Sequence, residues 1–417
     1  METVTADNWQ ANIPGDVLEE ARELLRGTEV LPDGLKALAE RIQLARKEKR
    51  PLRVKQGFDP TSTDLHLGHA VGFRKLRRFQ EFGHQVVVII GGFTARIGDP
   101  TGRNETRPIL TEEQVKANAQ TYLDQMGLIL DLSKTEVRDN SEWLAPLDLQ
   151  QVLRLAGTTT VNQLLGKEAF GDRIEKGLPL GLHELFYPLL QGYDSVAIDS
   201  DIELGGTDQR FNNLCGRDLQ IKYGSKVQQL VMLLPLLEGT DGEKKMSKSY
   251  GNYVGLKEPP TDMFGKVMRI PDSLILKYYE LCTTKTGTEI DEIGKHMKEG
   301  ANPMVFKTEL AKQIVVQYHG EDAGQKAVDD WKRVHSEKQV PDEMPSHTVA
   351  EPTALFRVMV NAGVASGTGE AKRLVAEGGV RLDGEQQKDP NAMIEIAAGE
   401  AMVLQVGRRK FVRLVCN

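Results

Sequence analysis

The chain of 417 residues is predicted to be an α/β protein with a doubly wound parallel sheet and a helical insertion in it. An α-helical domain and a small α+β domain are expected to follow. Three observations predict this class. The chain is too long for one ordinary domain. A strand, helix and strand pattern occupies 52–90, and a polar segment with two prolines at 336–345 is typical of a linker before a last module.

The front of the chain predicts the start of the sheet. Residues 14–49 are expected to be helical, because leucine, isoleucine and alanine recur there at helical spacing among charges. The pattern predicts a strand at 52–58, a helix at 70–81 and a buried β-branched strand at 85–90. Two parallel strands joined by a helix form a right-handed βαβ unit. This unit begins a Rossmann-like nucleotide-binding sheet.

The remaining elements complete the sheet and set the domain order. Helices are expected at 112–126, 149–155 and 161–170, inside a helical insertion at about 111–190. Further strands are expected at 195–198, 202–204 and 227–234, and helices again over 258–331. The expected organisation is a sheet domain at 1–240, a loop at 241–257, a helical domain at 258–335, a linker at 336–351 and an α+β module at 352–417.

Composition excludes several classes of protein. Apolar content of 40% and charged content of 27% are typical of a soluble globular chain. Cys215, Cys282 and Cys416 lie far apart, so they predict neither a disulfide framework nor a zinc site, and they suggest reduced thiols in the cytoplasm. No signal peptide or membrane-spanning run is apparent. A net charge of -7 argues against general coating of nucleic acid but allows a local basic surface.

A first motif lies at 59–69, with the sequence DPTSTDLHLGH. Thr63 or Asp64 is expected to cap a helix that starts at about Leu65. The free N–H groups and the positive end of that helix would then face a phosphate at the edge of the sheet.

Two histidines and a glycine in this motif favour nucleotide chemistry. His66 and His69 lie three residues apart on the first helical turn, where their N–H groups can donate to phosphate oxygens, and Gly68 leaves room for the nucleotide. An HxxH pair can also be an ordinary surface or core pair, or bind zinc, but no third ligand stands at a known spacing. The HxGH pattern alone also fits small adenylyltransferases.

The second motif is Lys245–Ser249, with the sequence KMSKS. A mobile turn is expected before it at 239–243. Lys245 and Lys248 would supply two cations that stabilise the charge on departing pyrophosphate. A cluster of lysine and serine on a loop is, in isolation, more often a solvated surface. The pairing with the first motif favours the chemical interpretation.

Together the two motifs resemble the ATP-handling signatures of class I aminoacyl-tRNA synthetases. Over nearly its whole length, the chain resembles the bacterial tyrosyl-tRNA synthetases whose first signature reads HLGH. The resemblance implies that tyrosine reacts with ATP to form tyrosyl-adenylate and pyrophosphate, and that tRNA(Tyr) then accepts the tyrosyl group. It implies ATP with Mg²⁺ as a substrate complex, no tightly bound protein metal, an anticodon-binding role for 258–335, and a cytoplasmic homodimer that pairs through the insertion.

The resemblance also assigns the tyrosine site. It implies that Tyr187, Gln191 and Asp99 hold the substrate ammonium, and that Asp194 accepts the phenolic hydroxyl. A cation needs oxygen acceptors, and a buried carboxylate aimed at a phenol is left unpaired when phenylalanine enters; tyrosyl-tRNA synthetase is a standard example of this discrimination. Lys55 stands where many members have a tyrosine, and it could bond the phenol or pair with Asp194.

The remaining assignments concern ATP and catalysis. Within Gly205–Gln209, Asp208 would hold the ribose hydroxyls and Gln209 would lie near the substrate carboxylate, although a plain β-turn is the alternative. The residues expected in catalysis are His66, His69, Thr61, Lys245 and Lys248. The residues expected to bind ATP are Asp59, Gly68, His66, His69, Gly206, Asp208, Met246, Ser247 and Lys248.

The C-terminal module is expected to bind RNA. Residues 366–375 and 378–384 resemble the alpha-L RNA-binding module that is shared with a ribosomal small-subunit protein. From Glu351 to Asn417 there are nine Lys and Arg against eight Asp and Glu, so this part is less acidic than the whole chain. Modules of this size can instead serve dimerisation. The expected RNA contacts are Lys372, Arg373 and Arg381, with 408–410 also available.

Two alternatives and one further cluster stay open. A tryptophanyl enzyme shares both signatures, but Asp194 with its partners and the RNA module argue against it. A non-catalytic RNA-binding descendant should have lost His69, Lys248 or Asp208, and all three are present. A second basic cluster, which could face RNA or solvent, is formed by Arg74, Lys75, Arg77 and Arg78.

Overall fold

The computed structural model describes residues 9–60, 64–99, 111–335, 344–397, 400–407 and 410–416. Contacts divide the chain into two compact units between Glu321 and Asp322. The finer boundaries expected from sequence stay predictions. Thr61, the capping candidate Thr63, the linker core 336–343, Arg408 and Arg409 lie outside the described residues.

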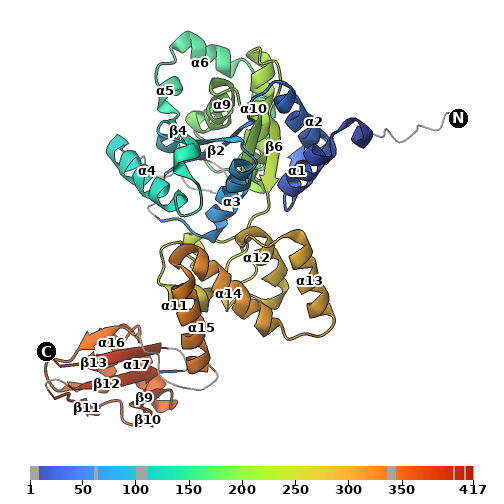
Figure 1. Cartoon of the computed structure of the whole chain (residues 1–417). Coiled ribbons are helices and arrows are strands. Elements are labelled where there is room, and N and C mark those ends of the chain that lie inside the picture. Colours follow the sequence, from blue (N-terminus) through green and yellow to red (C-terminus); the bar gives the residue numbers. More distant parts are fainter. Residues whose placement is uncertain are drawn as a thin grey trace. The chain divides into compact units, whose positions relative to one another are not determined.

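A six-stranded sheet forms the centre of the first unit (Figure 1). The strands are β1 (Glu29–Leu31), β2 (Arg53–Phe58), β3 (Gln85–Ile90), β4 (Thr135–Asp139), β5 (Ile202–Gly206) and β6 (Leu230–Leu234). Their order is β1-β6-β5-β2-β3-β4, and every neighbouring pair is parallel except β1 with β6. The doubly wound α/β class expected from sequence is confirmed.

The strand order reverses between β2 and β5. From β2 the chain continues outward to β3 and β4, whereas from β5 it continues in the other direction to β6. The two central strands pair only at Val54 with Ile202 and at Lys55 with Glu203. Beyond these pairs a crevice opens at the carboxyl ends of β2 and β5, the position where open α/β sheets bind ligands.

Helices cover both faces of this sheet. Helix α3 (Leu67–Glu81) packs on β2, β3 and β5, and α10 (Arg210–Lys222) packs on β5 and β6. Because the two right-handed crossovers run in opposite directions from the switch point, these helices lie on opposite faces. Helix α9 (Leu182–Ala197) packs closely on α10: a Cβ on Gly192 would lie 3.0 Å from the backbone nitrogen of Gly216.

The N-terminal segment contains a strand that the sequence pattern did not predict. Helices α1 (Gly15–Leu25) and α2 (Gly34–Lys47) confirm the helical expectation, but β1 lies between them and pairs with β6. A strand of three residues is too short for an alternation of apolar and polar residues to be recognised in the sequence.

The structure differs from the prediction in three places, within the insertion and just after it. The insertion contributes β4 to the sheet, and the expected strand at 195–198 is instead the end of α9. A short apolar run fits either structure, and here the helix that begins at Leu182 continues through it. The expected helix at 161–170 divides at Gly166. The insertion helices are α4 (Glu112–Met126), α5 (Ser141–Leu144), α6 (Leu149–Ala156), α7 (Val161–Leu165) and α8 (Glu168–Glu175).

The helical stretch after the sheet is confirmed. It consists of α11 (Pro260–Val267), α12 (Ile275–Cys282), α13 (Gly287–Lys298), α14 (Pro303–His319) and α15 (Glu321–His335). Side-chain caps start two of these helices: Thr286 and Glu289 form a capping box on α13, and Asn302 accepts from the Met304 N–H on α14. None of the described helices is long and apolar enough to cross a membrane.

The second unit contains a small α+β fold. Its five-stranded sheet has the order β10-β9-β12-β13-β7, and a separate pair joins β8 and β11. The strands are β7 (Ser346–Thr348), β8 (Thr353–Ala354), β9 (Val380–Leu382), β10 (Glu385–Gln386), β11 (Met393–Ile394), β12 (Ala401–Val406) and β13 (Lys410–Val415). Helices α16 (Leu355–Asn361) and α17 (Thr368–Ala376) share one buried apolar core with the strands.

Candidate active site

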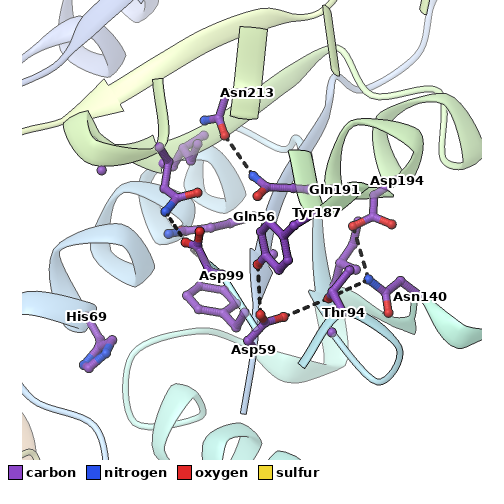
Figure 2. A pocket seen from close by; sticks show the side chains of 18 of the residues that line it. Gln56, Asp59, His69, Thr94, Asp99, Asn140, Tyr187, Gln191, Asp194 and Asn213 are labelled. Atoms are coloured by element: carbon purple, nitrogen blue, oxygen red, sulfur yellow. Dashed lines mark hydrogen bonds between the residues drawn. The ribbon is translucent and has the colours of Figure 1, made fainter. Parts of the chain in front are cut away.

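Two adjoining cavities open at the crevice between β2 and β5. The first has a volume of about 270 Å³ and the second of about 490 Å³. Gln56 and Phe58 of β2, His69 of α3 and Gly206 of β5 line both cavities. The two cavities are therefore compartments of one site, and Figure 2 shows the first of them.

Helix α9 supplies one wall of the first cavity. Tyr187, Gln191 and Asp194 are spaced by four and three residues, so they share one helical face and all line the cavity (Figure 2). Seven residues separate the first from the last, a rise of roughly 10 Å along the helix. The cavity thus presents different polar groups at its two ends to an elongated ligand.

One end is defined by the carboxylate of Asp194, which is 3% exposed. It accepts a hydrogen bond from Trp143 Nε1 at 2.9 Å, and Asn140 Nδ2 lies 3.5 Å from its other oxygen. Burial raises the pKa of Asp194 to about 7, although the positive charge of Lys55 and these two donors oppose the rise. Trp143 and Asn140 were not predicted from the sequence, because they come from the short segment after β4 and belong to no motif.

The other end is organised around Asp59. The Tyr187 hydroxyl donates to Asp59 Oδ2 at 2.8 Å, and the Thr94 hydroxyl donates to Oδ1 at 2.8 Å. Asn140 Nδ2 also lies 3.0 Å from Thr94 Oγ1, so a chain of polar contacts joins the two ends of the cavity (Figure 2). Burial and nearby carboxylates raise the pKa of Tyr187 well above its usual value, which keeps it a neutral donor. Asp59, expected to bind ATP, lines this cavity and not the second one.

A third group of polar residues lies at the same cavity. Asp99 and Gln209 line it, and Lys167 and Asn212 contact them without lining it. Gln209 Nε2 donates to Asp99 Oδ2 at 2.7 Å. The buried ammonium of Lys167 lies 3.7 Å from Asp99 Oδ1 and donates to Asn212 Oδ1 at 3.0 Å. The Asn212 amide in turn donates to the side-chain oxygens of Gln191 and Gln209. Lys167 and Asn212 carried no motif and were missed in the sequence.

Lys55 is buried and lines neither compartment of the site. Its ammonium is 3.1 Å from Glu203 Oε1 and donates to the carbonyl of Gln191 at 3.3 Å, and both charged side chains are buried. Ser195 and Gln229 also donate to Glu203. Of the two roles left open for Lys55, pairing with Asp194 is not the one that the structure shows, because its ion-pair partner is Glu203. The charged Glu203 inside the apolar strand pattern at 202–206 was the feature of the sequence that could have indicated a buried ion pair.

The start of α3 forms one side of the second cavity. His66 is the N-cap residue, which corrects the expected cap at Thr63 or Asp64 and the expected start near Leu65. The His66 N–H donates to His69 Nδ1 at 3.2 Å, and this bond places the ring proton of neutral His69 on Nε2. Burial lowers the pKa of His66 to about 2 and that of His69 to about 4, so both are neutral donors near pH 7.

The second motif also lines this cavity. Lys245, Met246 and Ser247 line it together with Gly68 and Asp208. Lys245 Nζ lies 3.2 Å from Asp208 Oδ2. By contrast, Lys248 is not among the lining residues, and its Nζ lies 3.4 Å from Asp64 Oδ2.

A buried asparagine holds the loop of the second motif. Asn252 Nδ2 donates to Asp241 Oδ2 at 2.8 Å and lies within 3.3 Å of the carbonyls of Lys244 and Lys245. Its Oδ1 accepts from the Ser247 N–H at 2.8 Å. One 3% exposed side chain therefore connects both ends of the turn that carries the lysines.

The expected RNA contacts of the second unit are on its surface. Lys372 and Arg373 lie on α17 and Arg381 lies on β9, and all three are exposed. The Lys372 ammonium is 4.7 Å from the centre of the Phe356 ring, and Arg381 donates to the carbonyl of Gly384 at 3.0 Å.

Comparisons with known proteins identify the family. A model described as class I tRNA synthetases (W and Y) matches residues 47–336, and one for the C-terminal domain of SYY-like tyrosine-tRNA ligases matches 337–414. The tyrosine-tRNA ligase of Moorella thermoacetica is 46% identical over 402 residues, 96% of each chain. The chain belongs to the tyrosine-tRNA ligase family.

Two other relatives support this membership in the tyrosine-tRNA ligase family. That of Thermotoga maritima is 50% identical over 369 residues, which cover 88% of this chain and 91% of the relative. A truncated mitochondrial tyrosyl-tRNA synthetase from Aspergillus nidulans has a TM-score of 0.63 at 22% identity, covering 76% of this chain and 94% of its own, and shows the same fold. The family and the fold expected from sequence are confirmed, and the tryptophanyl alternative is set aside.

Proposed function

We propose that the first cavity binds L-tyrosine and the second binds ATP, and that the chain joins the activated tyrosine to tRNA(Tyr). The observation that carries this assignment is the meeting of the two compartments at His69 and Gly206. The tyrosine carboxylate attacks the α-phosphorus of ATP there, a bond to pyrophosphate breaks, and tyrosyl-adenylate forms. A terminal hydroxyl of the tRNA then takes the tyrosyl group and releases AMP. Orientation and electrostatic stabilisation supply the catalysis.

In the first cavity, Asp194 accepts the phenolic hydroxyl. Tyr187, Gln191 and Asp99 hold the ammonium at the other end, where Asp59 keeps the Tyr187 hydroxyl in place. Gln209 lies near the tyrosine carboxylate and is already bonded to Asp99. Lys55 contributes indirectly, through its contacts with Glu203 and the Gln191 carbonyl.

In the second cavity, His66 and His69 donate to phosphate oxygens and Asp208 binds the ribose. Glycine at position 206 leaves room for the Asp208 carboxylate, because a Cβ there would lie 2.6 Å from Asp208 Oδ1. When ATP binds, Lys245 leaves Asp208 and Lys248 leaves Asp64. Both lysines then pair with the phosphates of ATP and with the departing pyrophosphate. ATP enters as its Mg²⁺ complex, with the metal on the phosphates. The described residues contain no cluster of three or more His, Cys, Asp or Glu suited to hold a metal.

We also propose a homodimer that pairs through the insertion. Five large apolar side chains on its helices and at the start of α9 are exposed, with Leu149 at 74% and Leu182 at 71%. A second copy would cover them. They are Leu149, Leu153, Val161, Ile174 and Leu182. Changing Leu149 and Leu153 together to lysine should yield monomers in sedimentation velocity, whereas an unchanged dimer would exclude this surface.

The helical region 258–335 is proposed to bind the anticodon, and the second unit to bind tRNA phosphates through Lys372, Arg373 and Arg381. Their exposure supports this role. Cytoplasmic localisation is proposed as well, and the free thiols of Cys215, Cys282 and Cys416 suit a reducing compartment.

Exchange of labelled pyrophosphate into ATP tests the activation step directly. The assay should be run with tyrosine, phenylalanine and tryptophan, in the unaltered chain and in Asp194→Ala. Exchange with tyrosine alone, lost in the variant, is the expected result. Exchange with tryptophan would reassign the first cavity, and no exchange with any of the three would reject the proposed chemistry.

A further inference from the structure

A third cavity in the first unit lies outside the site described above. Its volume is about 520 Å³, and it is formed by the end of α1, the C-terminal half of α3, the end of α4 and the connection between α12 and α13. Six basic and three acidic side chains line it, so its lining is strongly positive. The basic residues are Arg26, Arg74, Lys75, Arg77, Arg78 and Lys285.

The three lining carboxylates are already engaged. Glu81 pairs with Arg77 and Arg78, and Glu23 pairs with Arg78 at 2.7 Å. Glu280 lies 3.7 Å from Arg26. Lys285 pairs with Glu289, which caps α13. The acidic residues of the lining therefore leave two of its cations without a carboxylate partner.

Arg74 is the first of these cations. It makes no ion pair with any described residue, and its buried Nε has no hydrogen-bond partner. Its neighbours Tyr318 and Cys282 give no compensating charge, because burial raises the pKa of Tyr318 and raises that of Cys282 to about 12. A guanidinium keeps its charge in proteins. The positive charge of Arg74 is thus left uncompensated beside the cavity.

Lys75, the next residue of α3, is the second cation. Its ammonium donates to two main-chain carbonyls, those of Leu24 at 3.0 Å and Arg26 at 2.7 Å, and it makes no ion pair with a described carboxylate. These two bonds hold the ammonium in place and leave its third N–H for a further acceptor. Two adjacent residues of one helix therefore bring to the same cavity two cations that form no ion pair with a described residue, although Glu23 and Glu280 lie near enough to Lys75 to favour its charged form.

Phosphate has the chemistry that satisfies this arrangement. A charge withdrawn from water is stabilised only when it is paired and hydrogen-bonded. Phosphate oxygens accept two parallel bonds from a guanidinium and a further bond from an ammonium. We propose that the cavity binds a phosphate group between Arg74 and Lys75, supplied either by the backbone of an RNA or by a free phosphate compound.

Thermal unfolding with inorganic phosphate tests the site. Tyrosine and a non-hydrolysable ATP analogue should saturate the first two cavities, so that added phosphate reports on the third. Phosphate should raise the Tm saturably, by a few degrees at about 100 times its Kd. Arg74→Gln should lose this shift and Arg74→Lys should keep part of it. Arg22→Gln, an exposed arginine of α1 outside the cavity, is the matched control.

Binding of tRNA at several salt concentrations separates the two sources. If an RNA phosphate occupies the cavity, Arg74→Gln should weaken binding and reduce the slope of log K against log salt by about one unit, with Arg22→Gln unchanged. A lost phosphate shift with an unchanged slope supports a free phosphate compound. No difference between Arg74→Gln and the control in either assay overturns the proposal.

A direct observation covers the case in which Arg74→Gln does not fold. Crystals of the unaltered chain can be soaked in tungstate, a tetrahedral oxyanion with a strong anomalous signal. An anomalous peak beside Arg74 and Lys75 supports the site, and its absence at saturating tungstate rejects it.

Discussion

Trp143 Nε1 donates a hydrogen bond to Asp194 Oδ1 at 2.9 Å. The indole belongs to α5 in the insertion and the carboxylate belongs to α9, so the insertion orients the proposed phenol acceptor. Asn140 Nδ2 is farther from this carboxylate, at 3.5 Å. The geometry of one carboxylate oxygen therefore depends on a residue 51 positions away in the chain.

Trp143→Phe should weaken tyrosine binding while keeping most of the ring packing. Loss of a hydrogen bond to a charged group costs about 1.5–3 kcal/mol, so KM for tyrosine in pyrophosphate exchange should rise at least about tenfold. KM for ATP should stay the same. Trp9→Phe, in a short helical turn far from the cavities in the chain, is the control. A normal KM for tyrosine in Trp143→Phe would contradict this orienting role.

Tyrosine use should depend on pH through Asp194. Its pKa is raised to about 7 by burial, so kcat/KM for tyrosine should fall as the pH drops below about 7 and the carboxylate becomes protonated. The charged neighbours are Lys55 of β2, which lowers this pKa, and Glu203 of β5, which raises it. His66 and His69 titrate at much lower pH. In Asp194→Asn, kcat/KM for tyrosine should no longer fall as the pH drops below about 7. In the unaltered chain, a midpoint of this fall near pH 4 would contradict the raised pKa.

The same shift predicts the direction of a stability change. Between pH 4 and 7 the native state keeps the Asp194 proton that the unfolded state has released, so this group favours folding more as the pH falls through that window. Urea unfolding of Asp194→Asn and the unaltered chain at pH 5 and pH 8 measures the difference. The variant should gain relative stability at pH 8, and an equal difference at both pH values would contradict the assignment.

Lys55→Met should be strongly destabilising. It leaves the buried Glu203 carboxylate without its cation, and breaking a buried pair costs about 3–5 kcal/mol in the free energy of unfolding. The double variant Lys55→Met with Glu203→Gln should recover most of this loss, because no unpaired charge remains. Urea unfolding measures both, with exposed Lys47→Met as the control. Additive losses in the double variant would show that the pair does not act as a unit.

Asn252→Ala should slow activation without weakening tyrosine binding. The variant removes the contacts that join Asp241, Lys245 and Ser247, so the lysines would no longer be held beside the second cavity. We expect kcat of pyrophosphate exchange to fall at least about tenfold, since misplaced groups lose much of their effect. Asn302→Ala is the matched control: it should cost about 1 kcal/mol as a lost helix cap, with normal kcat. Equal kcat values in the two variants would reject the role of Asn252.

Much of the fold was predictable because its signals are local. The apolar run of β3 and the spacing along α4 gave element bounds that the structure confirms. The two motifs predicted a nucleotide site at the edge of the sheet, and the structure brings His66, His69 and Lys245 to one cavity there. These features depend on residues close together in the chain, whose periodicity and turn chemistry are visible in sequence.

The α/β class, the order of most elements and the family motifs can be read from local sequence patterns. Four further features appear only in the folded unit: β4 joins the sheet from within the insertion, 195–198 ends a helix, Lys55 pairs with Glu203, and Trp143 donates to Asp194. Each of these depends on partners that the chain brings together from distant positions. The sequence around a strand edge, a buried charge or a hydrogen-bond donor does not indicate which residue will be its partner. That partner is set by packing and burial, which are established only when the whole unit has folded.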